Sequence, residues 1–290
     1  MNVQKSYEQD TGAGKLYLVG TPIGNLEDIT FRALRTLKEV HWIAAEDTRQ
    51  TRKLLAHFDI STRLISYHEH NKHASGPELI RLLHSGDSIA LVSDAGLPAI
   101  SDPGADLVKQ AADEGIDVIP VPGANAALSA LIMSGLPTDR FTFLGFLPRE
   151  RKTLLEELQA LQQLKETLIC YESPHRVVKT LAAMLQVWNP ERRMCLVREL
   201  TKKYEEAARG TIQECYDLLQ EHPPQGEYCL VVEGVTESEQ TSAAAWWEAF
   251  GLEEHVEHYI VQGCNRKEAI KRAAADRQMP KRELYNYLHK

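Results

Sequence analysis

Three segments of the chain carry glycine, proline and polar side chains directly after an apolar run. They are Leu18–Leu26, Val92–Gly104 and Val121–Leu128. A loop of this composition lets a bound molecule approach the backbone closely, because glycine has no Cβ. In open α/β sheets ligands bind beyond the carboxyl ends of the strands. Three such loops together therefore predict a ligand site at one edge of a sheet.

The side chains in these loops indicate the chemistry of the ligand. Asp94 and Asp102 suit an amino group and ribose hydroxyls, and the small residues after Gly123 leave room for a flat adenine ring. The loop with Gly20 and Gly24 is not a Walker loop, because no Gly-Lys-Ser/Thr follows, and it lacks the third glycine of a dinucleotide fingerprint. Each loop alone is also compatible with a plain connection or tight helix packing. Their combination favours a nucleoside-like ligand.

Acid–base candidates end two further apolar runs. Glu46 and Asp47 end one run, and His68 and Asn71 end the other. Asp47 and His68 are the first choices for a general base or for the pair that orients it, because a positioned carboxylate or imidazole can take a proton from a bound nucleophile. The alternative for Glu46 and Asp47 is capping of the helix that is expected to begin at Thr48.

A metal site is a weaker alternative for the histidines. His68, His70 and His73 cluster in the sequence, but no carboxylate or cysteine at the customary ligand spacing completes the set. The five cysteines are scattered singly and form no C-x-x-C pair. We therefore predict no metal, and cysteines that are mostly reduced and buried.

Basic residues are candidates for contacts with phosphate. Arg49, Arg52 and Lys53 share helical spacing beside the proposed site, and Arg176 follows a later apolar run. Residues 264–290 contain eight basic and three acidic residues, a net charge of +5 in a chain whose net charge is −8. This asymmetry predicts a local nucleic-acid-binding module or, alternatively, a small dimerisation bundle. The candidate RNA contacts there are Arg266, Lys267, Lys271, Arg272, Lys281 and Arg282.

Alternating strands and helices must position these residues. The run Ile89–Val92 is continuously apolar, as expected for a parallel sheet that is covered on both faces. Helical periodicity fills the gaps between the strands, which predicts a three-layer α/β domain. The expected strands of this domain are Lys15–Gly20, Trp42–Glu46, Arg63–His68, Ser88–Asp94, Asp117–Pro122 and Phe141–Phe146.

A second, smaller α/β domain and a helical tail are expected to follow. The polar stretch Thr236–Ser242 lacks periodicity and is interpreted as a linker. The further strands are expected near Thr167–Glu172, Met194–Arg198, Glu205–Gly210 and Glu227–Glu233, and short helices near 243–262, 266–277 and 281–289. The predicted organisation is a tail at 1–14, α/β domains at 15–147 and 148–236, and a linker with a basic helical module at 237–290.

Composition limits the class of protein. The hydrophobic fraction is 43% and the charged fraction 26%, values typical of a globular protein with a sizeable core. The first residues lack the pattern of a signal peptide, and no stretch approaches the ~18 apolar residues of a membrane span. The expected location is the cytoplasm.

The three loops, in this order and spacing, resemble the cofactor-binding segments of the tetrapyrrole (corrin and porphyrin) methylase superfamily. The resemblance covers about residues 15–235. It implies a tetrapyrrole-methylase-like α/β fold, with two α/β domains, a cleft between them and a small helix-turn-helix-like module at the C-terminus. It also implies S-adenosylmethionine as the cofactor. The matching positions imply cofactor contacts at Pro22, Asp94, Ile100, Ser101, Asp102, Asn125, Ala126 and Glu172.

Longer strings narrow the resemblance to one group within the superfamily. Gly20–Thr30, Ala45–Arg49 and Tyr171–Arg176 resemble members that methylate the ribose 2'-hydroxyl of a cytidine in the decoding region of 16S ribosomal RNA. The resemblance implies the small ribosomal subunit as partner and a homodimer as the working form. The alternatives are a methylase of a small tetrapyrrole-like metabolite and a non-catalytic RNA-binding protein on the same fold.

Overall fold

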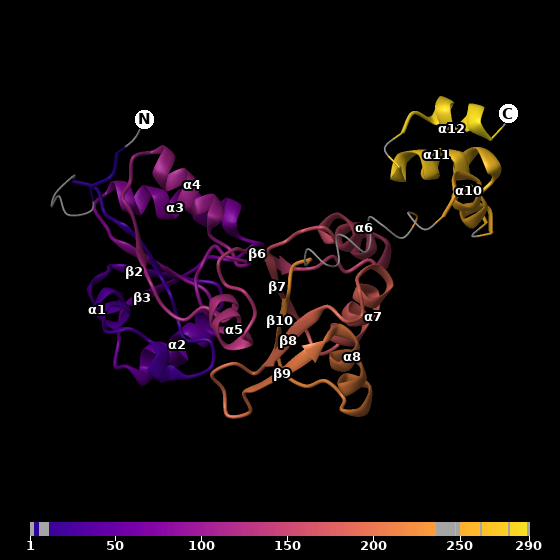
Figure 1. Cartoon of the computed structure of the whole chain (residues 1–290). Helices are drawn as coiled ribbons and strands as arrows, with labels where there is room; N and C mark the ends of the chain where they lie inside the picture. Colours follow the sequence, from indigo (N-terminus) through magenta and orange to yellow (C-terminus); the bar gives the residue numbers. More distant parts are fainter. Residues whose placement is uncertain are drawn as a thin grey trace. The chain divides into compact units, whose positions relative to one another are not determined.

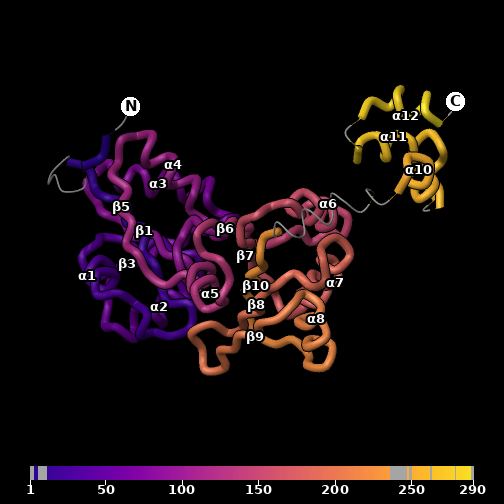
Figure 2. Tube along the Cα trace, viewed as in Figure 1, coloured from indigo at the N-terminus to yellow at the C-terminus, as the bar shows by residue number. Residues whose placement is uncertain are grey.

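The computed structural model describes residues 3–5, 12–235, 247, 250–261, 263–277 and 279–288. The chain divides into two compact units, the larger made of Met1–Gln162 with Glu166–Glu233, and the smaller of Gln163–Lys165 with Gly234–Lys290. The larger unit contains two sheets, and the smaller unit contains the C-terminal helices (Figures 1 and 2). The linker expected at Thr236–Ser242 lies outside the described residues.

The first sheet is parallel and has the strand order β3-β2-β4-β1-β5. Five of the six strands expected for this domain are confirmed, each shorter by one or two residues at one or both ends. The sixth, Phe141–Phe146, was assigned to the wrong sheet, because it pairs with Thr167–Glu172 in the second sheet. The bounds of the five are β1 Leu16–Val19, β2 Trp42–Ala45, β3 Arg63–Ser66, β4 Ile89–Val92 and β5 Val118–Val121. All four residues of β4 are buried, as its apolar composition predicts.

Helices cover both faces of this sheet. On one face α1 (Phe31–Glu39) and α2 (Thr48–His57) pack through Leu37 and Leu55. On the other face α3 (Lys72–His84) and α4 (Ala105–Asp113) pack through Leu79 and Leu107. The connection from β1 thus leaves on one face and the connection from β4 on the opposite face. The neighbouring strands β1 and β4 form the switch point at which such sheets bind ligands.

The second sheet is mixed and has the strand order β6-β7-β10-β8-β9. Helix α5 (Ala126–Ser134) covers one face, over a cluster that includes Ile169, Val197 and Val231. The helices α6, α7 and α8 lie on the other side (Figure 1). The bounds are β6 Phe141–Phe146, α6 Arg151–Leu161, β7 Thr167–Glu172, α7 Val177–Val187, β8 Arg193–Arg198, β9 Glu206–Thr211, α8 Ile212–Glu221 and β10 Tyr228–Val232.

The smaller unit is a three-helix module built on an alanine-rich core. Its helices are α10 Leu252–Val261, α11 Arg266–Asp276 and α12 Lys281–Tyr287. The apolar side chains of Val256, Ala269, Ile270, Ala273 and Leu284 pack together and are buried. The start of the helix expected from residue 243 lies outside the described residues.

The cysteines follow the prediction from the sequence. Cys170, Cys195, Cys215 and Cys229 are buried and unpaired, and Cys264 is partly buried. No helix within the described residues combines the length and apolar character that crossing a membrane requires.

Candidate active site

A cavity of about 580 Å³ lies at the carboxyl edge of the first sheet and reaches the second sheet. The acid–base candidate Glu46 lines it. So do residues expected to contact the cofactor: Asp94, Ile100, Ser101, Asp102, Asn125, Ala126 and Glu172. Pro22 is buried and lies beside the cavity-lining Ile23. The three glycine-containing loops therefore meet at one place, because the carboxyl ends of parallel strands share one edge of the sheet.

Two glycines hold the first and third loops against each other. A Cβ on Gly20 would lie 2.8 Å from the Cα of Gly123, and a Cβ on Gly123 would lie 2.9 Å from the Cα of Gly20. At Gly24 a Cβ would lie 2.4 Å from the Cγ of Lys202. Gly20 thus serves the packing of the first loop against the third, and Gly24 serves its packing against Lys202. The close approach of a ligand to these glycines stays a prediction.

The second loop is tied to the first and is strained. The N–H of Thr21 donates to the carbonyl of Gly96 at 2.9 Å, and the reverse bond measures 3.1 Å. Ala99 and Ser101 have φ angles of +68° and +61°, in the left-handed region that non-glycine residues rarely adopt. Such residues cost about 1–3 kcal/mol each and cluster at functional sites. Ser101, one of these two strained residues, lines the cavity.

Acidic side chains dominate the electrostatics of the cavity. Burial, followed by the nearby carboxylates of Asp102 and Asp94, raises the pKa of Glu46 above its usual value. Burial also raises the pKa of Asp102, while a hydrogen bond with Ser93 opposes the shift. A bound cation would lower the electrostatic free energy of these carboxylates. The cavity therefore suits a positively charged ligand, and Glu46 is suited to accept a proton.

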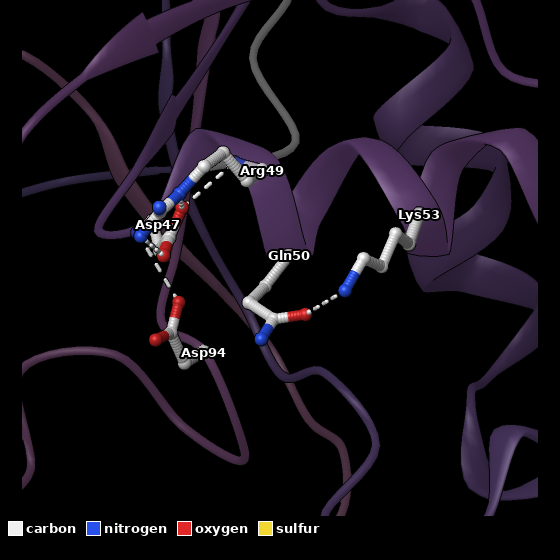
Figure 3. A network of polar contacts seen from close by, with 5 residues as sticks. All are labelled: Asp47, Arg49, Gln50, Lys53 and Asp94. Carbon is white, nitrogen blue, oxygen red and sulfur yellow. Dashed lines mark hydrogen bonds and ion pairs between the residues drawn. The ribbon is translucent and has the colours of Figure 1, made fainter.

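Asp47 is not among the residues that line this cavity, and it is the N-cap of helix α2 (Figure 3). Its Oδ1 accepts the N–H of Arg49 at 2.8 Å, and its Oδ2 pairs with the guanidinium of Arg49 at 2.7 Å. These bonds hold the pKa of Asp47 well below its usual range. The capping alternative is thus confirmed for Asp47, and its carboxylate is occupied by Arg49. The adjacent residue, Glu46, is the one that lines the cavity.

His68 and Asn71 close the turn after β3. Asn71 accepts the N–H of His68 at 2.7 Å and donates to the carbonyl of Ser66 at 3.0 Å. The Nδ1 of His68 is buried and has no hydrogen-bond partner among the described residues. Neither side chain lines the cavity, and β3 is the edge strand, separated from β4 by β2. A catalytic role for this pair stays a prediction that the geometry does not favour.

The wall from the second sheet contains a buried carboxylate. Glu172 is 3% exposed and accepts the N–H of Ser173 at 2.8 Å and the hydroxyl of Thr180 at 2.7 Å. Its other neighbour is Arg176, at 3.5 Å. Arg176 donates to the carbonyls of Leu147 and Pro148. Arg176 therefore joins the start of α7 to the segment that follows β6, and its guanidinium is engaged by protein groups. Its role as an RNA contact stays a prediction.

Tyr171 also lines the cavity, although it was not among the predicted site residues. Its hydroxyl accepts the N–H of Ala127 at 3.2 Å, which joins β7 to the first turn of α5. Burial raises the pKa of Tyr171 to about 12, so the phenol stays protonated. Asn125, the N-cap of α5, accepts the N–H of Leu128 at 2.9 Å. The sequence feature that could have identified Tyr171 as a site residue is its position directly before Glu172, at the end of a predicted strand.

The remaining basic candidates are exposed. On α2, Arg52 and Lys53 face solvent, and Lys53 donates to Gln50 at 3.2 Å (Figure 3). In the smaller unit the candidates lie on the exposed sides of α11 and α12, away from the buried core of that unit: Arg266, Lys267, Lys271, Arg272, Lys281 and Arg282. Among the described residues, no group of His, Cys, Asp and Glu side chains could hold a metal ion.

The chain is similar in sequence to proteins of known family. Residues 15–216 match the family model of the tetrapyrrole (corrin/porphyrin) methylases. The chain is 57% identical to ribosomal RNA small subunit methyltransferase I of Halalkalibacterium halodurans, over 100% of this chain and 99% of the relative. It is 55% identical to the protein of the same name from Bacillus subtilis, over 99% and 98%.

Solved structures share the fold of the larger part of the chain. Diphthine synthase superposes with a TM-score of 0.60 at 14% identity, over 77% of this chain and 91% of that chain. Uroporphyrin-III-C-methyltransferase from Thermus thermophilus superposes with a TM-score of 0.54 at 23% identity, over 79% and 97%. At these identities the likeness concerns the fold alone.

The cavity fits the methyl donor of this family, S-adenosylmethionine. The lining combines the carboxylates of Asp94 and Asp102, which suit a positively charged ligand, with the small residue Ala126 at the start of α5. The fold, the three loops, the match over residues 15–216 and the identity to full-length relatives agree. The chain therefore belongs to the tetrapyrrole methylase family, within it to the ribosomal RNA small subunit methyltransferase I group, and uses S-adenosylmethionine as its methyl donor.

Proposed function

We propose that this chain is a cytoplasmic enzyme that methylates the ribose 2'-hydroxyl of a cytidine in the decoding region of 16S ribosomal RNA. The full-length identity to relatives named for ribosomal RNA methylation supports the substrate class. The cavity that joins both sheets and holds Glu46 beside Asp94 and Asp102 carries the proposal, because it combines a seat for a cationic cofactor with a proton acceptor.

Glu46 is the proposed general base. A ribose hydroxyl is a weak nucleophile, and a positioned base that takes its proton adds about 10²–10⁴ to the rate. When bound, S-adenosylmethionine supplies the electrophilic methyl group. Asp94 lines the same cavity as Glu46, and its carboxylate accepts the backbone N–H of Asp47, the residue after Glu46, at 3.1 Å. Its raised pKa makes the carboxylate a stronger base than an exposed glutamate.

The residues of the cavity would orient the two substrates. Asp94 and Asp102 would hold the positive groups of the cofactor, and Asn125 and Ala126 would lie beside its adenine. Orientation of this kind supplies much of the rate of an in-line displacement, since the reacting atoms must be ~3–3.5 Å apart. The enclosing wall from Tyr171 and Glu172 would exclude water.

The smaller unit is proposed to bind RNA phosphates. Its six basic candidates are exposed, and the opposite sides of α11 and α12 are buried in its own core. A module whose apolar side is already covered has its charged side available for a partner. Arg52 and Lys53 on α2 would add contacts near the cavity.

The homodimer implied by the family is part of the proposal. Leu128 and Ile132 of α5 are 47% and 77% exposed and lie one helical turn apart. Exposed apolar side chains at this spacing would be covered by a second copy. Sedimentation of the purified protein and of the Ile132→Glu variant tests this, and an unchanged sedimentation coefficient would remove α5 from the interface.

The central experiment is methylation of small ribosomal subunits that lack the modification. The protein is incubated with these subunits and isotopically labelled S-adenosylmethionine, and the RNA is digested and mapped by mass spectrometry. The expected product is 2'-O-methylcytidine in the decoding region. Label at a base, at another nucleotide, or only in a tetrapyrrole offered in parallel would contradict the proposal.

A further inference from the structure

An aromatic side chain that the cofactor loops do not account for lines the same cavity. Phe146 is 58% exposed, although it lies at the end of strand β6, next to the buried Leu147. A phenyl ring left in water gives up the free energy of burial, about 1.5–3 kcal/mol for a side chain of this size. Its exposure at a cavity wall is therefore a feature that a bound molecule would use.

A bulge in β6 aims this ring at the cavity. Phe143 pairs with Ile169, but Gly145 pairs with Cys170, so Leu144 is an extra residue in the strand. In a regular strand Phe143 and Phe146 would point to opposite faces. Because of the bulge both rings contact Tyr171, with centroid distances of 5.1 Å and 5.7 Å. Bulges beside active sites commonly redirect a side chain in this way.

Glycine at position 145 makes the bulge possible. Its φ is +63°, a conformation that L side chains rarely adopt. A Cβ there would lie 3.1 Å from the Oγ of Ser101, which belongs to the second cofactor loop. The end of β6 is thus packed tightly against the loop that lines the cavity.

The backbone after Phe146 is also held in place. Arg176 donates to the carbonyls of Leu147 at 3.1 Å and Pro148 at 2.8 Å, and Arg176 itself pairs with the buried Glu172. The ring is therefore presented on a rigid segment. A preorganised surface of this kind binds a flat partner with little loss of conformational entropy.

The second loop adds an apolar side chain to the wall of the cavity. Ile100 is 43% exposed and lines the same cavity. Three residues beyond Phe146, Arg149 is exposed. An exposed aromatic ring three residues from an exposed arginine suits single-stranded nucleic acids, which bind through base stacking and phosphate contact.

We infer that Phe146 is the stacking platform for the base of the target nucleotide. The inference rests on the proposed function and adds the substrate contact that it lacks. A nucleotide whose 2'-hydroxyl enters the cavity leaves its stacked neighbours, and its base then needs a new surface, as the extruded base does in enzymes that act on bases. Phe146 supplies that surface at the cavity that contains Glu46, and it acts as a positioning residue. Stacking on a phenyl ring tolerates every base, so the choice of cytidine comes from other contacts.

The test compares Phe146→Ala and Phe146→Leu with Phe146→Trp, which restores a stacking surface. The control is Phe141→Leu at the other end of the same strand, because Phe141 is 42% exposed and does not line the cavity. The measurements are kcat/KM for unmodified small ribosomal subunits and the calorimetric affinity for S-adenosylmethionine. Circular dichroism checks that each variant is folded.

We expect kcat/KM for the RNA substrate to fall while the affinity for the cofactor is unchanged. Losing one base–aromatic stack should lower kcat/KM of the Ala and Leu variants about 5- to 150-fold, and Phe146→Trp should recover most of it. Affinity for S-adenosylmethionine should stay at the wild-type value, as should all properties of Phe141→Leu. An equal loss of cofactor affinity would place the ring against the cofactor and overturn the inference.

The outcomes also separate this inference from the proposed function. If the wild-type protein methylates the ribosomal RNA and Phe146→Ala keeps the wild-type kcat/KM, only the stacking role is wrong. If the wild-type protein leaves the RNA unmethylated, the proposed function fails and the stacking role fails with it.

Discussion

The carboxylate of Asp94 accepts the backbone N–H of Asp47 at 3.1 Å, which ties the end of β4 to the end of β2 (Figure 3). This bond places a negative charge beside Glu46, and that charge contributes to the raised pKa of Glu46. Asp47 itself is occupied by Arg49 at the start of α2. Of the two neighbouring acidic residues, Asp47 caps a helix and Glu46 lines the cavity.

Glu46→Gln should abolish most of the methyl transfer. Removing the base should lower kcat about 10²- to 10⁴-fold while cofactor affinity is retained. The base acts as the carboxylate, so wild-type activity should fall as the pH drops through a pKa above 4.5, the usual value. Single-turnover methylation over a range of pH measures both effects, and the acid limb should be absent from the residual activity of the variant.

Asp47→Asn provides the matched comparison one residue away. It removes the ion pair with Arg49 but keeps a side chain that can cap α2. Turnover should remain near the wild-type value, and thermal stability should decrease. If Asp47→Asn is inactive and Glu46→Gln is active, the base is Asp47.

Gly123→Ala should disturb the cofactor loops. The new Cβ would lie 2.9 Å from the Cα of Gly20, and such overpacking costs about 1–3 kcal/mol. We expect weaker binding of S-adenosylmethionine by calorimetry and a lower melting temperature. Gly251→Ala in the smaller unit is the control, because its added Cβ would lie 3.5 Å from the Oε2 of Glu254, an ordinary contact, and cofactor affinity should stay at the wild-type value. Unchanged cofactor affinity in Gly123→Ala would show that close packing of the first and third loops is not required for cofactor binding.

Replacing the exposed basic residues of α11 and α12 by glutamine should weaken RNA binding in a salt-dependent manner. Each lost phosphate contact should flatten the slope of log K against log salt by about 0.7 for single-stranded RNA. Binding of S-adenosylmethionine by the larger unit should not change. A preserved slope together with altered sedimentation would instead favour the dimerisation role. The residues are Arg266, Lys267, Lys271, Arg272, Lys281 and Arg282.

The smaller unit should lose stability in mild acid because of His255. This side chain is buried, its Nδ1 accepts from Arg277 at 3.0 Å, and its Nε2 lies 3.0 Å from Asp276. Burial lowers its pKa below 6.5, and the bond with Asp276 only partly opposes this shift. The unfolded state therefore binds a proton at a higher pH than the folded state does, so stability falls as the pH drops below 6.5.

Hydrogen exchange of the full-length protein measures this effect. The amides of α10–α12 should exchange faster at pH 5.5 than at pH 7.5 after correction for intrinsic rates. His255→Asn, which cannot gain this proton, should be less stable at both values and show a smaller difference between them. Equal protection of the wild-type helices at both pH values would contradict the prediction.

Much of the architecture is determined by local sequence. Ile89–Val92 predicts a buried strand because only a sheet covered on both faces hides four consecutive apolar side chains. The loop from Ser93 to Gly104 predicts a place in the site, because the carboxyl ends of parallel strands meet at one edge. Periodicity and turn composition depend on near neighbours in the chain, and these are fully present in the sequence.

The tertiary structure decided which of these residues line the cavity. Glu46 and Asp47 are equivalent in type, and only the start of α2 and the contact with Asp94 distinguish them. In the sequence Arg176 is indistinguishable from a surface charge, and only the fold brings Glu172 and the carbonyl of Leu147 next to it. Phe146 enters the cavity because pairing with β7 forces a bulge. Burial, strand register and pKa depend on groups that are distant in sequence, so local sequence patterns cannot specify them.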